Sequence, residues 1–246
     1  MGAFAECLKT WRKSRRFSQL ELAVEAEVSA RHISFLETGR AKPSAEMVGR
    51  LGDALRLPLT ARNQLLTSAG YAVRYAGTRW DGADLAPIRD AVEYTLQRHS
   101  PYPGLAVDRL WTVLRMNEAA TKLFAPLGVG IGGSMLDLLV SDSLPPLVEN
   151  WAEVAHHAVQ RLRTESAAQG GVARLDEVAV RLAKHASAGP TRVRPVVPTV
   201  FRLGSKRLSL FATIAQFGTP EDVTLDDVKV ELYFPADAET KDALLR

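Results

Sequence analysis

Apolar positions recur at helical spacing in residues 18–39, which read SQLELAVEAEVSARHISFLETG. Ser18 and Glu21 have the spacing of a capping box, which predicts the start of one helix. Ser29 is suited to cap a second helix, and Gly39 is suited to end it. The inward-facing stripes predicted for the two helices are Leu20, Ala23 and Val24, then Ile33 and Leu36. The pattern predicts two short helices joined by a tight turn.

Three further helices are predicted around this pair, which makes five in about 70 residues. One precedes it, with Phe4, Leu8 and Trp11 on a single face, Ser44 begins another, and LTARNQLLTSAG forms the last. Basic residues cluster upstream of the pair at Lys9, Arg12, Lys13, Arg15 and Arg16. A plain helical hairpin is one interpretation of the pair. The surrounding cations favour a helix-turn-helix, which places its second helix in the DNA major groove.

The second helix of the pair is expected to carry the contacts to DNA bases. Arg31 can bind guanine O6 and N7, and Phe35 can pack on a thymine methyl group. The complete set of predicted base-contacting residues is Ala30, Arg31, Ser34 and Phe35. Contacts to the DNA backbone are assigned to Gln19 and Ser29, with further phosphate contacts from Arg12, Arg40 and Lys42. The predicted partner is an operator in double-stranded DNA.

The positive charge of the chain belongs to these five helices. Residues 1–70 hold 11 basic and 7 acidic side chains, whereas residues 71–246 hold 20 basic and 21 acidic ones. A domain with a net charge of +4 neutralises few phosphates, so that one copy is expected to bind DNA weakly. We therefore expect a homodimer, held largely through the second domain, on a palindromic operator.

Residues 4–70 resemble the phage-repressor (Cro-like, XRE) helix-turn-helix domain. The resemblance rests on the motifs SQ-ELA, VS and I--LE-G and on the Pro-Ser pair that opens the fourth helix. One position departs from the pattern, because Glu27 stands in the interhelix turn, where Gly is common. A non-Gly residue held at positive φ costs about 1 kcal/mol. The sequence therefore predicts a strained or differently shaped turn at Glu27.

From residue 85 onward, helical segments mix with β-branched runs, which favours an α+β domain. A strand pair is predicted at LAVD and RLWTVLRM, turning near Asp108-Arg109, and three more strands at VVPTVFRL, RLSLFATIAQF and VKVELYFPA. Helices are predicted at residues 85–99, 117–124, 134–139, 144–168 and 175–186. This order is PAS-like, with an antiparallel sheet flanked by helices. The expected organisation is an all-α five-helix head at 1–70, a linker at 71–84 and a PAS-like sensor domain at 85–246.

Four motifs in the second domain resemble the MmyB-like transcription regulators. They are Trp-x-Val-Leu-x-x-Asn at 111–117, Asn150-Trp151, LSLFATIAQFGTPEDVTL at 208–225 and the ELYFPAD ending. The resemblance implies a one-component regulator, not an enzyme, whose sensor domain holds a small apolar effector. Fatty acids are the ligand class associated with that family. No catalytic residue or resident cofactor is expected.

From the residues alone, the many Leu, Val, Phe and Trp side chains of this domain could line a cavity or fill a packed core. The carboxylate of a fatty acid would need a cation or hydrogen-bond donors at the pocket mouth. Arg115 is one candidate because it shares strand parity with Trp111 and Val113, and Tyr102, Asn150 and His156 are others. The predicted ligand-binding residues are Tyr102, Trp111, Val113, Arg115, Phe124, Leu139, Asn150, Trp151, Val154, Ala155, Phe211 and Ile214.

Two other motifs suggest different chemistry. Residues 128–133 match G-x-G-x-x-G, but the charged helix NEAATKLF precedes them where a dinucleotide site needs a strand, so we expect a flexible loop. Ser134 and Lys184 could form a self-cleavage dyad acting at Ala69-Gly70, which is an alternative function. A regulator whose second domain only mediates dimerisation is another.

Metal and membrane association are not expected. His156 and His157 are adjacent on a predicted helix and point in different directions, so they cannot form a two-ligand site on one face. The single Cys7 leaves no disulfide framework, and no secretory segment or apolar run of membrane length is seen. The chain is therefore expected to be cytoplasmic.

Overall fold

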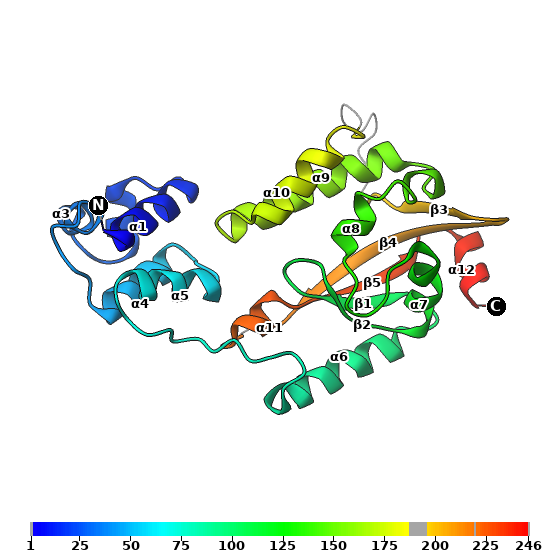
Figure 1. The fold of residues 1–246 in the computed structure, drawn as a ribbon, viewed down its shortest axis with the longest axis horizontal. Coiled ribbons are helices and arrows are strands. Elements are labelled where there is room, and N and C mark those ends of the chain that lie inside the picture. Colours follow the sequence, from blue (N-terminus) through cyan, green and yellow to red (C-terminus); the bar gives the residue numbers. More distant parts are fainter. Residues whose placement is uncertain (1, 187–195, 219, 246) are drawn as a thin grey trace. The chain divides into compact units, whose positions relative to one another are not determined.

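The computed structural model describes residues 2–186, 196–218 and 220–245. The chain divides into two compact units, one built mainly from the first 77 residues and the other mainly from residues 78 to 246. Five helices come first and an α+β arrangement with an antiparallel sheet follows, which confirms the predicted fold class (Figure 1). The narrower boundaries, a head at 1–70 and a linker at 71–84, remain a prediction.

The head forms because short capped helices bury one side each in a common core. Its helices are α1 (Ala3–Ser14), α2 (Gln19–Glu25), α3 (Ala30–Glu37), α4 (Ala45–Ala54) and α5 (Leu59–Ser68). The predicted capping box is present, since Ser18 Oγ accepts from the Glu21 N–H and the Glu21 carboxylate accepts from the Ser18 N–H. Side chains with no exposed surface anchor the core: Leu8, Leu22, Ile33, Leu36, Leu51 and Leu65.

The apolar stripe predicted for α2 is partly wrong. Leu20 and Val24 are 65% and 68% exposed, whereas Leu22 is buried next to the correctly predicted Ala23. A helix of seven residues makes two turns, so that its sequence fits two phases of the helical period almost equally well. Tertiary packing selects the phase, because Leu22 belongs to the same core cluster as Ile33.

The turn between α2 and α3 has the positive φ that the sequence predicts. Glu27 has φ of 51°, in the left-handed region that non-Gly residues rarely adopt. Arg50 of α4 holds this turn, because its Nη2 donates to the carbonyl oxygens of Ala26 and Glu27 at 2.6 and 2.8 Å. The strain at Glu27 is therefore offset by two hydrogen bonds to the turn backbone.

The second unit holds a five-stranded antiparallel sheet with the strand order β2-β1-β5-β4-β3. The strands are β1 (Gly104–Val107), β2 (Val113–Met116), β3 (Thr199–Leu203), β4 (Lys206–Gln216) and β5 (Lys229–Pro235). The helices after the head are α6 (Ala86–Arg98), α7 (Glu118–Phe124), α8 (Met135–Leu139), α9 (Trp151–Ala168), α10 (Ala173–Leu182), α11 (Val223–Asp227) and α12 (Ala238–Leu245). Short 3₁₀ turns lie at Ala83–Leu85, Ala125–Leu127 and Pro145–Leu147.

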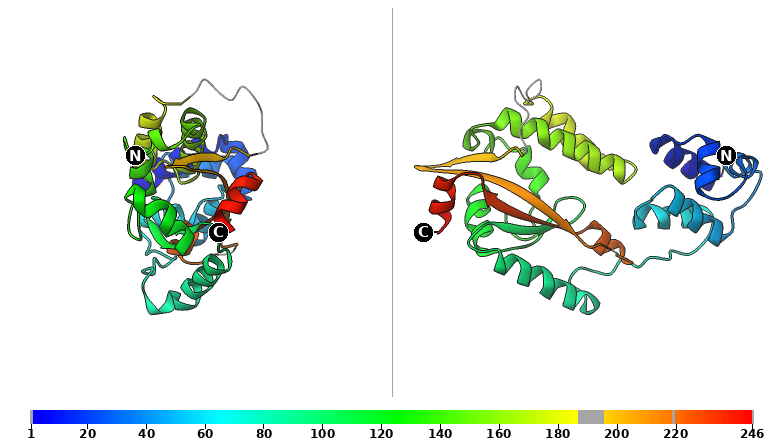
Figure 2. Two further views of the ribbon diagram at one scale, coloured as in Figure 1. Left: turned by 90° about the vertical axis from the view of Figure 1, so that its right-hand side faces the viewer. Right: turned by 180° about the vertical axis from the view of Figure 1, so that it is seen from behind.

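The two faces of the sheet pack against different helices, with α6 on one side and α9 and α10 on the other (Figures 1 and 2). Val92 and Leu96 of α6 form a cluster with Ala106 and Val230. Leu105, next to Ala106 along β1, belongs instead to the large core shared with α7 to α10. This division follows from strand geometry, because successive side chains of a strand point to opposite faces.

Two element boundaries predicted from the sequence are wrong. The helix predicted from residue 144 begins only at Trp151, because Val148 forms a β-bridge with Phe201 of β3 and so leaves the helical path. The strand predicted at RLWTVLRM is confined to residues 113–116, since Trp111 has φ of 59° and the Asp108 carboxylate accepts from two backbone N–H groups of the turn. Both differences arise from backbone contacts that hydrophobic periodicity does not report.

Candidate nucleic-acid interface and ligand pocket

The predicted base-contacting residues lie together on one side of α3. Ile33 and Leu36 turn inward with no exposed surface, which leaves Arg31 exposed and Ala30, Ser34 and Phe35 partly exposed. The Arg31 guanidinium lies over the Phe35 ring at 5.2 Å from its centre. The outer side of α3 therefore presents a cation next to an apolar ring. A cation suits the predicted contact of Arg31 with guanine, and an apolar ring suits the predicted contact of Phe35 with a thymine methyl group.

The residues assigned to the DNA backbone fall into two groups. Ser29, Arg40 and Lys42 are exposed at the start of α3 and in the loop after it, where phosphates could reach them. Ser29 Oγ also caps α3 by accepting from the His32 N–H at 3.1 Å. Ser29, Arg40 and Lys42 therefore remain candidates for contacts to the DNA backbone.

Arg12 belongs to the second group and is not available to a phosphate. Its side chain is largely buried, and Nε and Nη2 donate to the two carboxylate oxygens of Glu37 at 2.6 and 2.9 Å. Nη1 donates to the carbonyl oxygen of Phe17 at 2.7 Å, so that all three nitrogens are used. The phosphate contact assigned to Arg12 is therefore corrected to an internal ion pair that joins α1 to α3.

Gln19 contacts the same carboxylate, since its Nε2 donates to Glu37 Oε2 at 2.8 Å. Glu37 is only 3% exposed. Burial raises the pKa of Glu37, but the hydrogen bonds from Arg12 and Gln19 outweigh it and hold this pKa below its usual value. No role was predicted for Glu37 from the sequence, although Glu37 is the acid of the I--LE-G motif.

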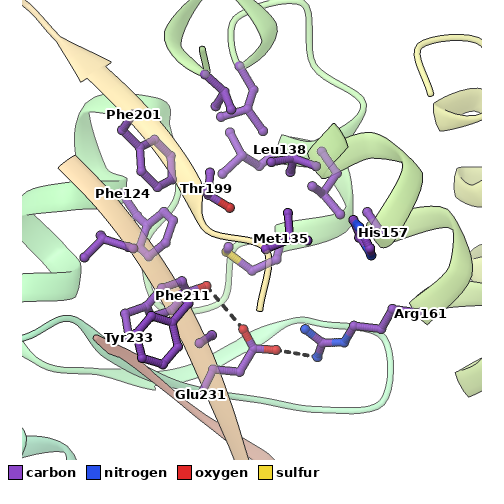
Figure 3. Close-up of a pocket in the computed structure, with 18 of the residues that line it drawn as sticks. Phe124, Met135, Leu138, His157, Arg161, Thr199, Phe201, Phe211, Glu231 and Tyr233 are labelled. Carbon is purple, nitrogen blue, oxygen red and sulfur yellow. Dashed lines mark hydrogen bonds and ion pairs between the residues drawn. The ribbon is translucent and has the colours of Figure 1, made fainter. Parts of the chain in front are cut away.

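A cavity of about 250 Å³ lies in the second unit between α9, α8 and the sheet (Figure 3). Its wall is mainly apolar and includes Val107, Phe124, Met135, Leu138, Leu144, Val148, Ala158, Val197, Phe201 and Leu210. Six of the predicted ligand-binding residues line it: Trp111, Phe124, Leu139, Trp151, Val154 and Phe211. The core of this unit is therefore not completely filled, in contrast to the close packing usual for protein interiors.

The other six predicted residues do not line the cavity. Val113 and Ala155 are buried in packed core, and Ile214 is 47% exposed near the end of β4. Asn150 donates to the carbonyl oxygen of Pro198 and accepts from the Val200 N–H, which ties the start of α9 to β3. Tyr102 packs instead in an aromatic cluster with His99 and Phe234.

Arg115 is the sixth, and a β-bulge explains why its predicted position is wrong. Ala106 pairs with Arg115, whereas the next residue, Val107, pairs with Val113, so that Leu114 is an extra residue in β2. Residues directly opposite each other in a sheet share a face. Arg115 therefore lies on the same face as Ala106, which packs against α6. Arg115 was expected on the face of Val113, but one inserted residue reverses the alternation of side chains between the two faces of the sheet.

A compact set of charges centred on Arg161 adjoins the cavity, and Arg161 and Glu231 belong to the cavity wall. The Arg161 side chain forms an ion pair with Glu231 of β5 (Figure 3). It also pairs with Glu165 at 2.9 Å and lies 4.1 Å from the centre of the Trp111 ring. Lys229 contacts Glu165 at 2.6 Å, and the Trp111 indole N–H donates to Glu165 at 2.9 Å. Two cations and two carboxylates thus neutralise one another.

These contacts shift the pKa values of Glu165 and of the neighbouring Tyr233. Burial raises the pKa of Glu165, but contacts with Lys229, Arg161 and Trp111 outweigh it and lower the pKa overall. Burial and the charge of Glu231 raise the pKa of Tyr233 well above its ordinary value, so the hydroxyl keeps its proton and donates to Glu231 at 3.2 Å. This set was not predicted from the sequence, although Lys229, Glu231 and Tyr233 alternate along β5 and so share one face.

The structure gives no support to the alternative chemistries. Ser134 Oγ caps α8 by accepting from the Asp137 N–H, and Lys184 is exposed beyond the end of α10, whereas a dyad needs a desolvated lysine. The glycines at 128–133 follow a 3₁₀ turn and not a strand. Among the described residues, no group of His, Cys, Asp or Glu is arranged to hold a metal ion. None of the described helices has the length and apolar character needed to cross a bilayer.

Comparison with known families agrees with both parts of this description. The family described as MmyB-like transcription regulator ligand binding domain matches residues 88–246, which is more than half of the chain. The family described as helix-turn-helix domain matches residues 3–65. A search of curated proteins found no match. The first match contains the cavity, and the second contains the exposed side of α3.

Proposed function

The chain belongs to the MmyB-like transcription regulators, and from this premise we propose that its cavity binds an acyl-chain effector that changes the affinity of its helix-turn-helix for an operator. The cavity is the single observation that carries the proposal, because its wall is mainly apolar and it lies inside the matched ligand-binding domain. A fatty acid is the simplest such effector. A water molecule takes up about 30 Å³ of liquid, and a non-hydrogen atom of a small organic compound needs a similar space. The cavity of about 250 Å³ therefore suits a compound of roughly eight to ten non-hydrogen atoms.

The proposal assigns the base contacts to Ala30, Arg31, Ser34 and Phe35, which share the outer side of α3. Gln19, Ser29, Arg40 and Lys42 are proposed to contact the DNA backbone. A single α3 presents a small surface to DNA, so we propose a homodimer, held largely through the second domain, on a palindromic operator. A regulator of this kind acts on DNA in the cytoplasm, and that location is part of the proposal.

The effector is tested on the purified full chain. Solvent extraction followed by mass spectrometry is expected to release an acyl compound, and native mass spectrometry is expected to show the same mass as an adduct on a dimer. Operator affinity is then measured with and without that compound. An effector that favours one arrangement of the protein by about 1.4 kcal/mol changes DNA affinity tenfold.

The outcomes separate the alternatives. An empty extract, together with no thermal stabilisation by a panel of acyl compounds, would leave a domain that only mediates dimerisation. Two fragments that meet at residues 69 and 70 after long incubation would instead indicate self-cleavage. Sedimentation as a monomer at micromolar concentration, with footprints over one half-site, would contradict the dimer.

A further inference from the structure

Two nitrogen atoms on α9 stand out because they are buried without a hydrogen-bond partner among the residues that the structure describes. They are Nε1 of Trp151 and Nε2 of His157. Both side chains line the cavity. An indole nitrogen can only donate, and a histidine Nε2 donates in one of its two neutral tautomers. Buried polar atoms without partners are rare in folded proteins, so these two nitrogens mark the part of the cavity wall where an acceptor is most favourable.

The charged set lies toward the C-terminal end of α9, away from Trp151. At 1.5 Å per residue, Arg161 is about 15 Å along the helix from Trp151 and about 6 Å from His157. Arg161 is paired with Glu231 and Glu165, and Lys229 is also paired with Glu165. A carboxylate placed beside Arg161 would lie next to that of Glu231 and would add an unbalanced negative charge. This end of the cavity therefore offers no free cation to an acid.

We propose that the ligand presents an uncharged acyl carbonyl, as in an ester, amide or ketone, to Trp151 Nε1, with His157 as a second contact. The apolar chain then extends among Phe124, Met135, Leu138 and Phe201, which surround the middle of the cavity (Figure 3). An ionised carboxylate is disfavoured, because Arg161, the one Arg or Lys side chain that the described residues contribute to the mainly apolar wall, is already paired and cannot compensate its lost hydration. This inference rests on the proposed function, since it requires an acyl compound in the cavity, and it narrows the effector from a free fatty acid to an uncharged acyl derivative.

The test compares three probes of similar length by calorimetry on the full chain at pH 7.5: methyl heptanoate, the heptanoate anion and decane. The ester is expected to bind at least tenfold more tightly than the anion. It should also exceed decane by roughly 2- to 12-fold, which is the effect of one hydrogen bond to a carbonyl oxygen.

Replacement of the donor isolates its contribution. Trp151→Phe keeps an aromatic ring but removes the N–H, so the ester is expected to lose the same roughly 2- to 12-fold while decane binding stays unchanged. Trp80→Phe is the matched control, because Trp80 Nε1 is also buried without a described partner but does not line the cavity. It should alter neither probe. His157→Leu gives a second variant in case Trp151→Phe impairs folding.

Contrary results are distinguishable. If the anion binds as tightly as the ester, the carbonyl assignment is overturned and the proposed function stands. Equal weakening of ester and decane in Trp151→Phe would show that the ring acts by shape alone, which also overturns the inference. If none of the probes binds and extraction releases no acyl compound, the proposed function itself fails.

Discussion

The ion pair between Arg12 and Glu37 leads to the most quantitative prediction. Glu37 is 3% exposed and accepts from Arg12 through two nitrogens and from Gln19 through one. Arg12→Met keeps most of the aliphatic stem but leaves this carboxylate buried without its cation. Removal of one partner of a buried pair costs about 3–5 kcal/mol. Because domains are stable by about 5–15 kcal/mol in total, the head of this variant is expected to be close to unfolding.

The two units of the chain need not unfold together, so one global transition would not isolate this effect. Hydrogen exchange of peptides from α1 and α3, followed by mass spectrometry, measures the stability of the head alone. Lys13→Met is the matched control, because Lys13 is exposed on the same helix, and it should change stability by less than about 0.5 kcal/mol. Arg12→Met with Glu37→Leu should recover most of the loss, since an apolar pair can replace a buried ion pair.

The same pair sets a pH dependence with a definite sign. The pKa of Glu37 is lowered in the folded head from its ordinary value of 4.5, because its contacts with Arg12 and Gln19 outweigh burial. The carboxylate therefore contributes its full stabilisation above about pH 4.5, and this contribution is lost as the pH falls through the folded pKa. Glu37→Gln should flatten the acid limb of the stability curve. An Arg12→Met head within about 1 kcal/mol of the parent would refute the whole argument.

Three further predictions concern DNA contact, the interhelix turn and the cavity. Arg31→Ala should lose about 1–3 kcal/mol of specific DNA binding, whereas Lys42→Ala should weaken binding to all DNA sequences alike and reduce the salt slope of binding by about 1. Filter binding at several salt concentrations separates the two effects. If both variants bind as the parent does, the exposed side of α3 is not the DNA-binding surface. Glu27→Gly should stabilise the head by up to about 1 kcal/mol in exchange measurements, because glycine adopts positive φ freely, and a loss of stability would show that the turn is unstrained. Ala158→Trp should fill the cavity and abolish the binding of methyl heptanoate measured by calorimetry. Ala152→Trp, at an exposed position of the same helix, should leave this binding unchanged. Unchanged binding in Ala158→Trp would place the ligand outside the cavity.

The sequence was most informative where local chemistry decides the structure. The caps at Ser18 and Ser29 and the exposed side of α3 could be predicted because they depend on residues within a few positions of one another. Single apolar residues in short elements could not be assigned in the same way. Leu20 and Leu22 both fit a helix of two turns, and only the tertiary core shows that Leu22 is the buried one.

The cavity was predicted only in part, because lining depends on which face a residue shares and on where the core stays open. Trp111 and Phe124 could be identified as large apolar side chains near the sheet. Arg115 could not be placed, since one extra residue, Leu114, changes the face and leaves no sign in the hydrophobic pattern. Arg161 was missed because its partner Glu231 is 70 residues away in the sequence.

The contact between Gln19 and Glu37 has a consequence for how the head meets DNA. One N–H of the Gln19 amide is held by a carboxylate that Arg12 holds in turn, so the side chain is ordered in the free protein. Ordering a flexible side chain on binding costs about 0.5–1.5 kcal/mol. For the proposed backbone contact of Gln19, much of this entropy is already lost when the head folds. The remaining N–H of Gln19 is thus preorganised at the start of α2 to donate to a phosphate, without a search among rotamers.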